Sequence, residues 1–129
     1  MGESLKTYSA LTFAFLGDTV YSMHVCDRIV RMGNMPTAKL HKRMSEIVKA
    51  PAQAKALDAI EDVLFEDEKE VIKRGMNSKP EHHAKNSSLF EYQKATALEA
   101  LFGYLYLEGR SERIEELVEL CMKATRKSF

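Results

Sequence analysis

Two acidic residues stand in segments that otherwise consist mostly of apolar and small residues. Asp18 lies in "AFLGDTVY" and Glu99 lies in "ALEALFGYLYLEG". On a helix, the residues three and four positions away are surface neighbours, and neither acid has a basic residue at any of these positions. A single such acid can be structural, because it can accept hydrogen bonds from a loop or cap a neighbouring helix. Two of them indicate a site, because an unpaired buried carboxylate is costly.

Paired carboxylates suit hard cations such as Mg²⁺, which binds one or two protein carboxylates, keeps several waters and contacts phosphate oxygens of its substrate. Asp18 and Glu99 therefore predict phosphoryl chemistry. His82 and His83 are a weaker alternative metal site, because they are adjacent in a polar loop and no further Cys or His stands at zinc spacing. Cys26 and Cys121 are far apart inside helical patterns, so we expect reduced thiols in the core.

The elements that must position the two acids are helices. Apolar residues recur at helical spacing through most of the 129-residue chain, and no segment alternates as a strand would. Between Tyr8 and Met32 we expect two helices, or one bent at Gly17, because apolar residues recur there at helical spacing: Leu11, Phe15, Val20, Met23, Ile29 and Val30. Further helices are expected after Thr37 as N-cap, from Pro51, over about 65–73, from about 89 to Gly109, and after Ser111 as cap. Residues 74–88 are predicted to form a loop. The predicted fold is a single all-α domain.

Charge gives no global signal, since the formal net charge is zero. An anionic ligand must therefore be bound locally, and the basic segments "KLHKR" and "KRGMNSK" are the candidates. The acidic run "EDVLFEDEKE" is expected to be a solvated helix face. No apolar run approaches the roughly eighteen residues of a membrane helix, and the first residues do not resemble a signal peptide, so we expect a cytoplasmic protein.

The segment "FLGDTVY" resembles the ribonuclease III signature, which carries a metal-linked aspartate, and "ALEALFGYLYLEG" resembles the second motif, which carries a glutamate. "LHKRMSEIVKAPAQAKAL" and "VIKRGMNSK" are similar to the short bacterial Mini-III branch of that family. By this resemblance Asp18 is the family aspartate and Glu99 the family glutamate. Full-length ribonuclease III has two further acids where this chain has Ala14 and Thr96, a reduction that the Mini-III branch shares. The number of metal ions is therefore left open.

The resemblance implies a ribonuclease III-type endonuclease domain over residues 1–129, without a separate double-stranded RNA-binding domain. It implies a homodimer that cuts double-stranded RNA with Mg²⁺ held by Asp18 and Glu99, leaves 5′-phosphate ends, and matures large-subunit (23S) ribosomal RNA. A ribosomal protein on the substrate is a further partner to consider. The dimer contact is expected at apolar residues such as Phe13 and Phe15. The alternatives are a non-catalytic helical module that binds RNA or protein, and a nucleotide hydrolase, which would need more inward-facing acids.

Duplex RNA is recognised largely through its phosphates and 2′-hydroxyls, so cations should flank the acidic centre. Solvated surface is the alternative for each of these residues, because Lys and Arg are mostly exposed in any protein. The expected RNA-binding residues come from the two basic segments: Lys39, His41, Lys42, Arg43, Lys73, Arg74, Asn77 and Lys79.

Overall fold

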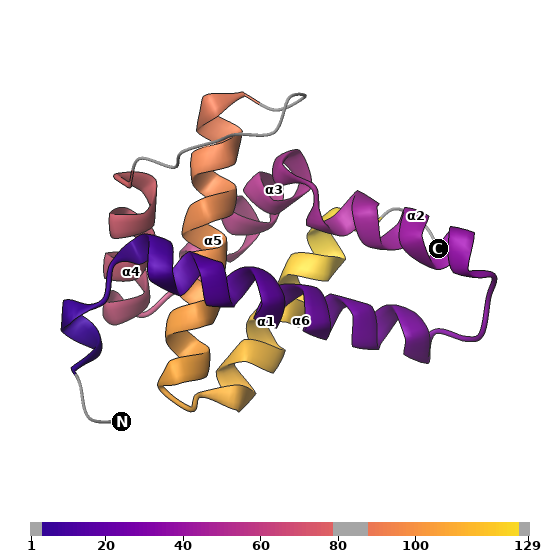
Figure 1. Cartoon of the computed structure of the whole chain (residues 1–129), viewed down its shortest axis with the longest axis horizontal. Coiled ribbons are helices and arrows are strands. Elements are labelled where there is room, and N and C mark those ends of the chain that lie inside the picture. Colours follow the sequence, from indigo (N-terminus) through magenta and orange to yellow (C-terminus); the bar gives the residue numbers. More distant parts are fainter. Residues whose placement is uncertain (1–3, 79–87, 127–129) are drawn as a thin grey trace.

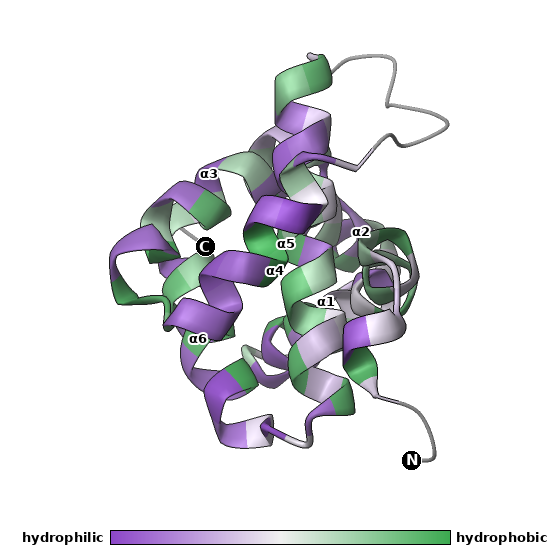
Figure 2. Ribbon diagram, turned by 90° about the vertical axis from the view of Figure 1, so that its left-hand side faces the viewer, coloured by the Kyte–Doolittle hydropathy of each residue, from purple (hydrophilic) through white to green (hydrophobic). Residues whose placement is uncertain are grey.

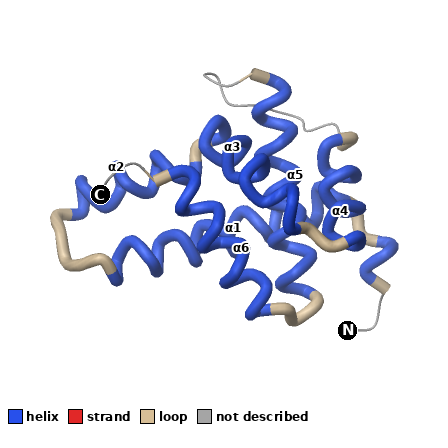
Figure 3. The backbone as a smooth tube through the Cα atoms, turned by 180° about the vertical axis from the view of Figure 1, so that it is seen from behind, coloured by secondary structure: helices blue, strands red, loops and turns tan. Residues whose placement is uncertain are grey.

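The computed structural model describes residues 4–78 and 88–126, and within them it contains helices and connecting loops but no strand (Figure 3). The predicted all-α class is confirmed. None of the described helices is long and apolar enough to cross a membrane. The elements are η1 (Leu5–Thr7), α1 (Ala10–Arg31), α2 (Thr37–Val48), α3 (Ala50–Ile60), η2 (Glu61–Val63), α4 (Glu66–Met76), α5 (Leu89–Leu107) and α6 (Ser111–Thr125).

Helix α5 forms the centre of the fold, with α1, α3 and α4 packed against it (Figure 1). Its second half is apolar apart from Glu99 and two tyrosines, and most of it is buried, as expected of a helix that its neighbours surround. The more amphipathic α4 and α6 lie outside it and show hydrophilic residues along their visible sides (Figure 2). The buried residues of α5 are Ala95, Thr96, Ala97, Leu98, Ala100, Leu101, Phe102, Gly103 and Leu105.

Helix α1 is continuous through Gly17, so of the two predicted alternatives the one with two separate helices is wrong. Gly17 instead lies where α1 crosses α5. A Cβ at Gly17 would stand 1.6 Å from the Glu99 carbonyl oxygen, and one at Gly103 would stand 1.9 Å from the Phe13 carbonyl oxygen. Both glycines are therefore required because they let two helix backbones touch, not because they loosen a helix.

Only part of the apolar stripe expected on α1 is buried. Val20 and Ile29 belong to the core, whereas Leu11, Phe15, Met23 and Val30 are exposed, Phe15 to 84%. Cys26 is also exposed, which corrects its assignment as a core thiol, while Cys121 is buried as expected. The reason is that contact through Gly17 turns the opposite side of α1 to solvent.

Phe13 corrects a second expectation, because it is only 1% exposed. Its ring stacks on Tyr8 and meets Tyr104 edge-on, so it packs inside its own chain. Of the two phenylalanines expected at a dimer contact, Phe15 alone has its side chain on the surface.

Helix boundaries follow the sequence signals with small shifts. Thr37 and Ser111 are the first residues of their helices, after Pro36 and Arg110, and not the caps that the sequence suggested. Pro51 lies in the first turn of α3 as predicted. Gly33 and Gly109 follow the ends of α1 and α5 with positive φ, a backbone that glycine adopts without strain.

The acidic run does not lie entirely in solvent, because Glu68 on α4 is completely buried. Its carboxylate accepts hydrogen bonds from Arg113 at 2.7 and 2.8 Å, from Arg110 at 3.1 Å and from the Phe65 backbone N–H at 2.8 Å. We call Glu68, Arg110 and Arg113 the Glu68 cluster. It joins α4 to α6, and it explains why an acid in this run is inside the protein.

Candidate functional site

The crossing of α1 and α5 brings the two predicted acids together. Gly17, whose backbone touches that of Glu99, immediately precedes Asp18. Burial of the Glu99 side chain, and next the negative charge of Asp18, raise the pKa of Glu99 to about 8 from its ordinary 4.5. Asp18 and Glu99, which are far apart in sequence, thus form one acidic centre.

Burial at this centre is less complete than the sequence suggested. Asp18 is exposed and Glu99 is half-buried. Asp18 follows the buried Gly17 by one residue, and a step of about 100° around the helix carries its side chain to the solvent edge of the contact. The free-energy cost of burying a charge, which was the reason to single out Asp18 in the sequence, therefore does not apply to this exposed residue. Two features distinguish the centre. The two carboxylates face each other, and no ion pair within residues 4–78 and 88–126 joins either of them to a basic side chain.

Gln53 also belongs to the centre, and the sequence analysis missed it. It lies in the first turns of α3 with 3% of its surface exposed. Its side-chain Nε2 donates to the Val48 carbonyl at 2.8 Å and to Glu99 Oε2 at 3.3 Å. The only available signal was an amide between small residues in "PAQAKAL", which is otherwise a buried pattern.

These residues fit a hard cation. Asp18 and Glu99 offer carboxylate oxygens from two helices whose backbones touch at Gly17. Gln53 presents its amide nitrogen, and not its oxygen, to Glu99. Carboxylate oxygens are the ligand type that Mg²⁺ takes from proteins.

The protein ligand set is small. Ala14 and Thr96, at the positions where full-length ribonuclease III has acids, are both buried, and the Thr96 hydroxyl donates to the Tyr92 carbonyl on its own helix. The described part of the chain holds no group of three or more His, Cys, Asp or Glu that could bind a metal ion. A cation here must complete its coordination with water or with oxygens of a substrate.

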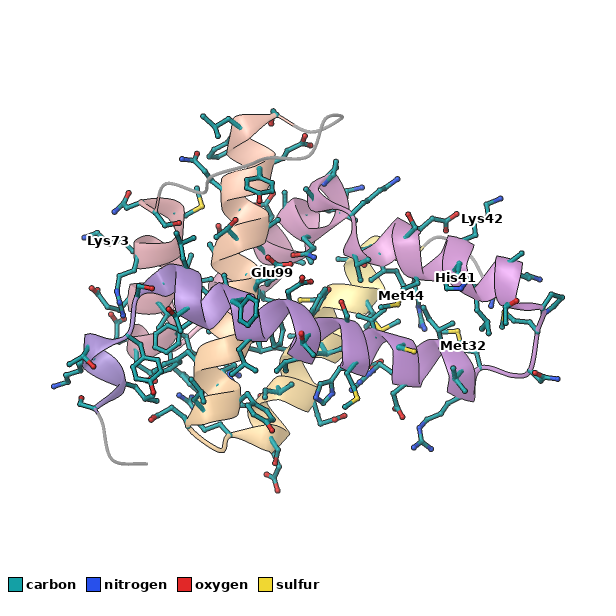
Figure 4. The ribbon with its side chains drawn as sticks, viewed as in Figure 1. Met32, His41, Lys42, Met44, Lys73 and Glu99 are labelled. Atoms are coloured by element: carbon teal, nitrogen blue, oxygen red, sulfur yellow. The ribbon has the colours of Figure 1, made fainter. Side chains whose placement is uncertain are left out.

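The predicted RNA-binding residues lie on two sides of Glu99. Figure 4 shows His41 and Lys42 on α2 to one side of it and Lys73 on α4 to the other. Lys39, His41, Lys42, Lys73 and Asn77 are exposed, whereas Arg43 is half-buried. Their contact with RNA stays a prediction.

Arg74 and Lys79 stand apart from that set. The Arg74 guanidinium donates to the Tyr8 carbonyl and lies over the Phe13 ring at 5.7 Å, so it holds the start of the chain against α4. Lys79, together with the alternative metal ligands His82 and His83, lies outside the described residues.

Comparison with known proteins agrees with this fold. Residues 11–110 match the profile of the ribonuclease III domain, a span that contains both acids. A crystal structure of a Fusobacterium nucleatum protein superposes with a TM-score of 0.86 at 30% identity, covering 95% of this chain and 99% of that one. The chain belongs to the ribonuclease III domain family.

Within that family its relatives are the short Mini-ribonuclease 3 proteins, which confirms the predicted branch. The Mini-ribonuclease 3 of Thermoanaerobacter sp. (strain X514) is 41% identical over 121 residues, which are 94% of this chain and 85% of the relative. That of Brevibacillus brevis is 45% identical over 109 residues, which are 84% of this chain and 81% of the relative.

Proposed function

We propose that this protein is a Mg²⁺-dependent endoribonuclease that cuts double-stranded RNA, with Asp18 and Glu99 as metal-binding catalytic residues. The observation that carries the proposal is the pairing of these two carboxylates at the α1–α5 crossing without a basic partner among the described residues. The names of the relatives support a ribonuclease.

The proposal assigns a role to each residue of the centre and to the cations near it. Asp18 and Glu99 hold the cation from two helices whose relative position is fixed by Gly17 and Gly103. Mg²⁺ bound there would activate a water for attack on phosphorus and neutralise charge on the phosphate oxygens. Because Asp18 is exposed, a duplex can reach it without opening the fold. Lys42 and Lys73 lie on either side of Glu99 (Figure 4), and we propose that they bind phosphates.

A site with two protein carboxylates should bind Mg²⁺ weakly alone and more tightly with RNA, whose phosphate oxygens supply further ligands. Water attack with departure of the 3′ oxygen gives 5′-phosphate and 3′-hydroxyl ends. By the resemblance to the Mini-III branch, the proposed substrate is the precursor of large-subunit (23S) ribosomal RNA in the cytoplasm. A ribosomal protein bound to that precursor is the proposed additional partner.

We further propose that the active form is a homodimer that meets along α1. Leu11, Phe15, Met23 and Val30 are exposed apolar residues that lie within about 120° of one another around this helix. Phe15→Glu should give a monomer with reduced cleavage, because it places a charge in that face. Phe90→Glu, at an exposed phenylalanine on α5, is the matched control. Sedimentation that shows a wild-type monomer with full activity would exclude the dimer.

The activity is tested by incubating the protein with a structured duplex RNA and with a single-stranded RNA of the same composition, each with and without Mg²⁺. The proposal expects cleavage of the duplex alone, and only with the metal. The alternative function, a non-catalytic RNA-binding module, expects binding to the duplex without any new ends. Cleavage that persists in excess chelator would contradict the metal requirement.

A further inference from the structure

Gln53 connects two parts of the molecule that the proposed function uses separately. Its Nε2 donates one hydrogen bond to the carbonyl of Val48, the last residue of α2, and one to the Glu99 carboxylate. Helix α2 carries the exposed His41 and Lys42, and α5 carries Glu99. A single amide group therefore bridges the proposed RNA-binding helix and the proposed metal ligand.

The orientation of this amide follows from its neighbours. Both Val48 O and Glu99 Oε2 accept hydrogen bonds, so the nitrogen must face them and the oxygen must face away. Rotation by 180° would set the amide oxygen against two acceptors. The Gln53 backbone is held as well, because its N–H donates to the Lys49 carbonyl at 3.0 Å in the first turn of α3.

The other end of the amide shows that packing alone does not explain this residue. Gln53 Oε1 is buried and has no partner among the described residues, which costs free energy. An unbranched apolar side chain such as methionine has a similar size and would avoid that cost. A glutamine at this position is therefore explained by what its nitrogen does.

We infer that Gln53 is a positioning residue, which fixes the Glu99 carboxylate in its metal-binding orientation and ties it to the end of α2. This inference rests on the proposed function of Glu99. A carboxylate on a glutamate stem has three rotatable bonds, and one hydrogen bond to a rigid donor removes much of that freedom. Asp18, on the shorter aspartate stem, has fewer bonds to restrain.

The test compares Gln53→Met with Gln93→Met, which makes the same chemical change at a half-buried glutamine on α5, six residues before Glu99. Gln53→Met should lower kcat on duplex RNA at least about tenfold while KM for RNA changes less than about twofold. A readout without catalysis is the rise of Tm as Mg²⁺ is added to the protein alone. The Mg²⁺ concentration at half of that rise should increase about tenfold in Gln53→Met and stay unchanged in Gln93→Met.

A purely structural role predicts a different pattern, in which Gln53→Met lowers Tm while kcat and the Mg²⁺ midpoint equal those of Gln93→Met. That result would overturn the inference. Gln53→Leu also removes the donor and adds no charge, so it replaces the methionine variant if that one does not fold. If both fail to fold, Gln53 is structural and the inference is wrong. Failure of the wild type to cut RNA would refute the proposed function instead, and the Mg²⁺ midpoints would still test Gln53.

Discussion

Two glutamates of this protein are removed from water, and they differ in their partners. Glu68 is completely buried and accepts hydrogen bonds from two arginines and a backbone N–H. Glu99 is only half-buried, yet it faces another carboxylate and a single amide. The more deeply buried acid is the satisfied one. Missing counter-charge, more than depth, therefore distinguishes a candidate metal ligand from a structural acid.

The surroundings of the Glu68 cluster extend this contrast. The Arg113 guanidinium lies 4.0 Å from the centre of the Phe65 ring and also contacts Glu116 at 2.8 Å, and Arg110 contacts Asp67 at 2.6 Å. Each charged side chain of the Glu68 cluster is therefore paired with another group of the protein. At the Asp18–Glu99 centre, no ion pair among the described residues involves either carboxylate.

Neutralising each glutamate in turn should give the largest difference in stability. Glu68→Gln leaves two arginines without their shared anion, so we expect a loss of about 3 kcal/mol in the free energy of unfolding. Glu99→Gln removes an unfavourable charge, so stability without metal should be unchanged or higher. Urea unfolding in metal-free buffer at pH 8 measures both. Equal losses in the two variants would show that Glu99 is a structural acid as well.

Separating the two helices should damage the Asp18–Glu99 centre and spare the Glu68 cluster. Gly17→Ala sets a methyl group against the Glu99 carbonyl, and overpacking of this kind costs about 1–3 kcal/mol. RNA cleavage should fall with it, because the distance between the two carboxylates changes. Gly109→Asn is the control, since a side chain there meets nothing within 4 Å and Asn tolerates positive φ. Unchanged cleavage in Gly17→Ala would contradict the role of this crossing.

The stability of the metal-free protein should depend on pH through Glu99. Burial and the charge of Asp18 raise its pKa to about 8 from 4.5, so between these values the folded state keeps a proton that the unfolded state has lost. Stability from this group is therefore highest below pH 4.5 and falls as the pH rises to 8, by about 1–2 kcal/mol after allowance for solvent near a half-buried group. The difference between wild type and Glu99→Gln, measured by urea unfolding across this range, isolates the effect. A difference that does not vary with pH would contradict the raised pKa.

The smallest expected effect concerns the exposed cations near the centre, which we propose to bind RNA. Lys73→Ala should weaken binding to all duplexes alike and lower the slope of log K against log salt by about 1, because one fewer counterion is released. Arg74 is unsuited to this test, because its contacts with Tyr8 and Phe13 support the fold. Lys123→Ala, at an exposed lysine on α6, is the control. An unchanged slope in Lys73→Ala would place the duplex elsewhere.

The sequence was enough to predict an all-helical fold and both acids of the centre. The helical periodicity of the apolar residues predicts the fold, and the position of the two acids in apolar segments indicates the site. It could not show that Gly17 joins two helices instead of breaking one, because a glycine in a helix gives the same local signal in either case. It also assigned Phe13 and Cys26 to the wrong surroundings. Which side of α1 is covered depends on α5, which lies some 80 residues later in the sequence.

Glu68 and Gln53 show the same limit for polar residues. Glu68 stands in a run of six acids, and only the arrival of Arg110 and Arg113 from the chain after α5 makes it a buried residue. Gln53 is identified as part of the centre only by its hydrogen bond to Glu99, which is 46 residues away in sequence. In both cases the partner is distant in sequence, so local composition carries no signal of the contact.

Cleavage of duplex RNA in Mg²⁺ by Asp18→Asn and Glu99→Gln tests the central claim most directly. Each variant keeps its shape but loses a ligand charge, so cleavage should fall at least roughly a thousandfold, while helical content and binding to the duplex remain. Asp27→Asn, at an exposed aspartate of α1 that pairs with Arg31 at 2.9 Å, is the matched control and should cleave normally. Near-normal cleavage by either Asp18→Asn or Glu99→Gln would contradict the assignment of this pair as the catalytic centre.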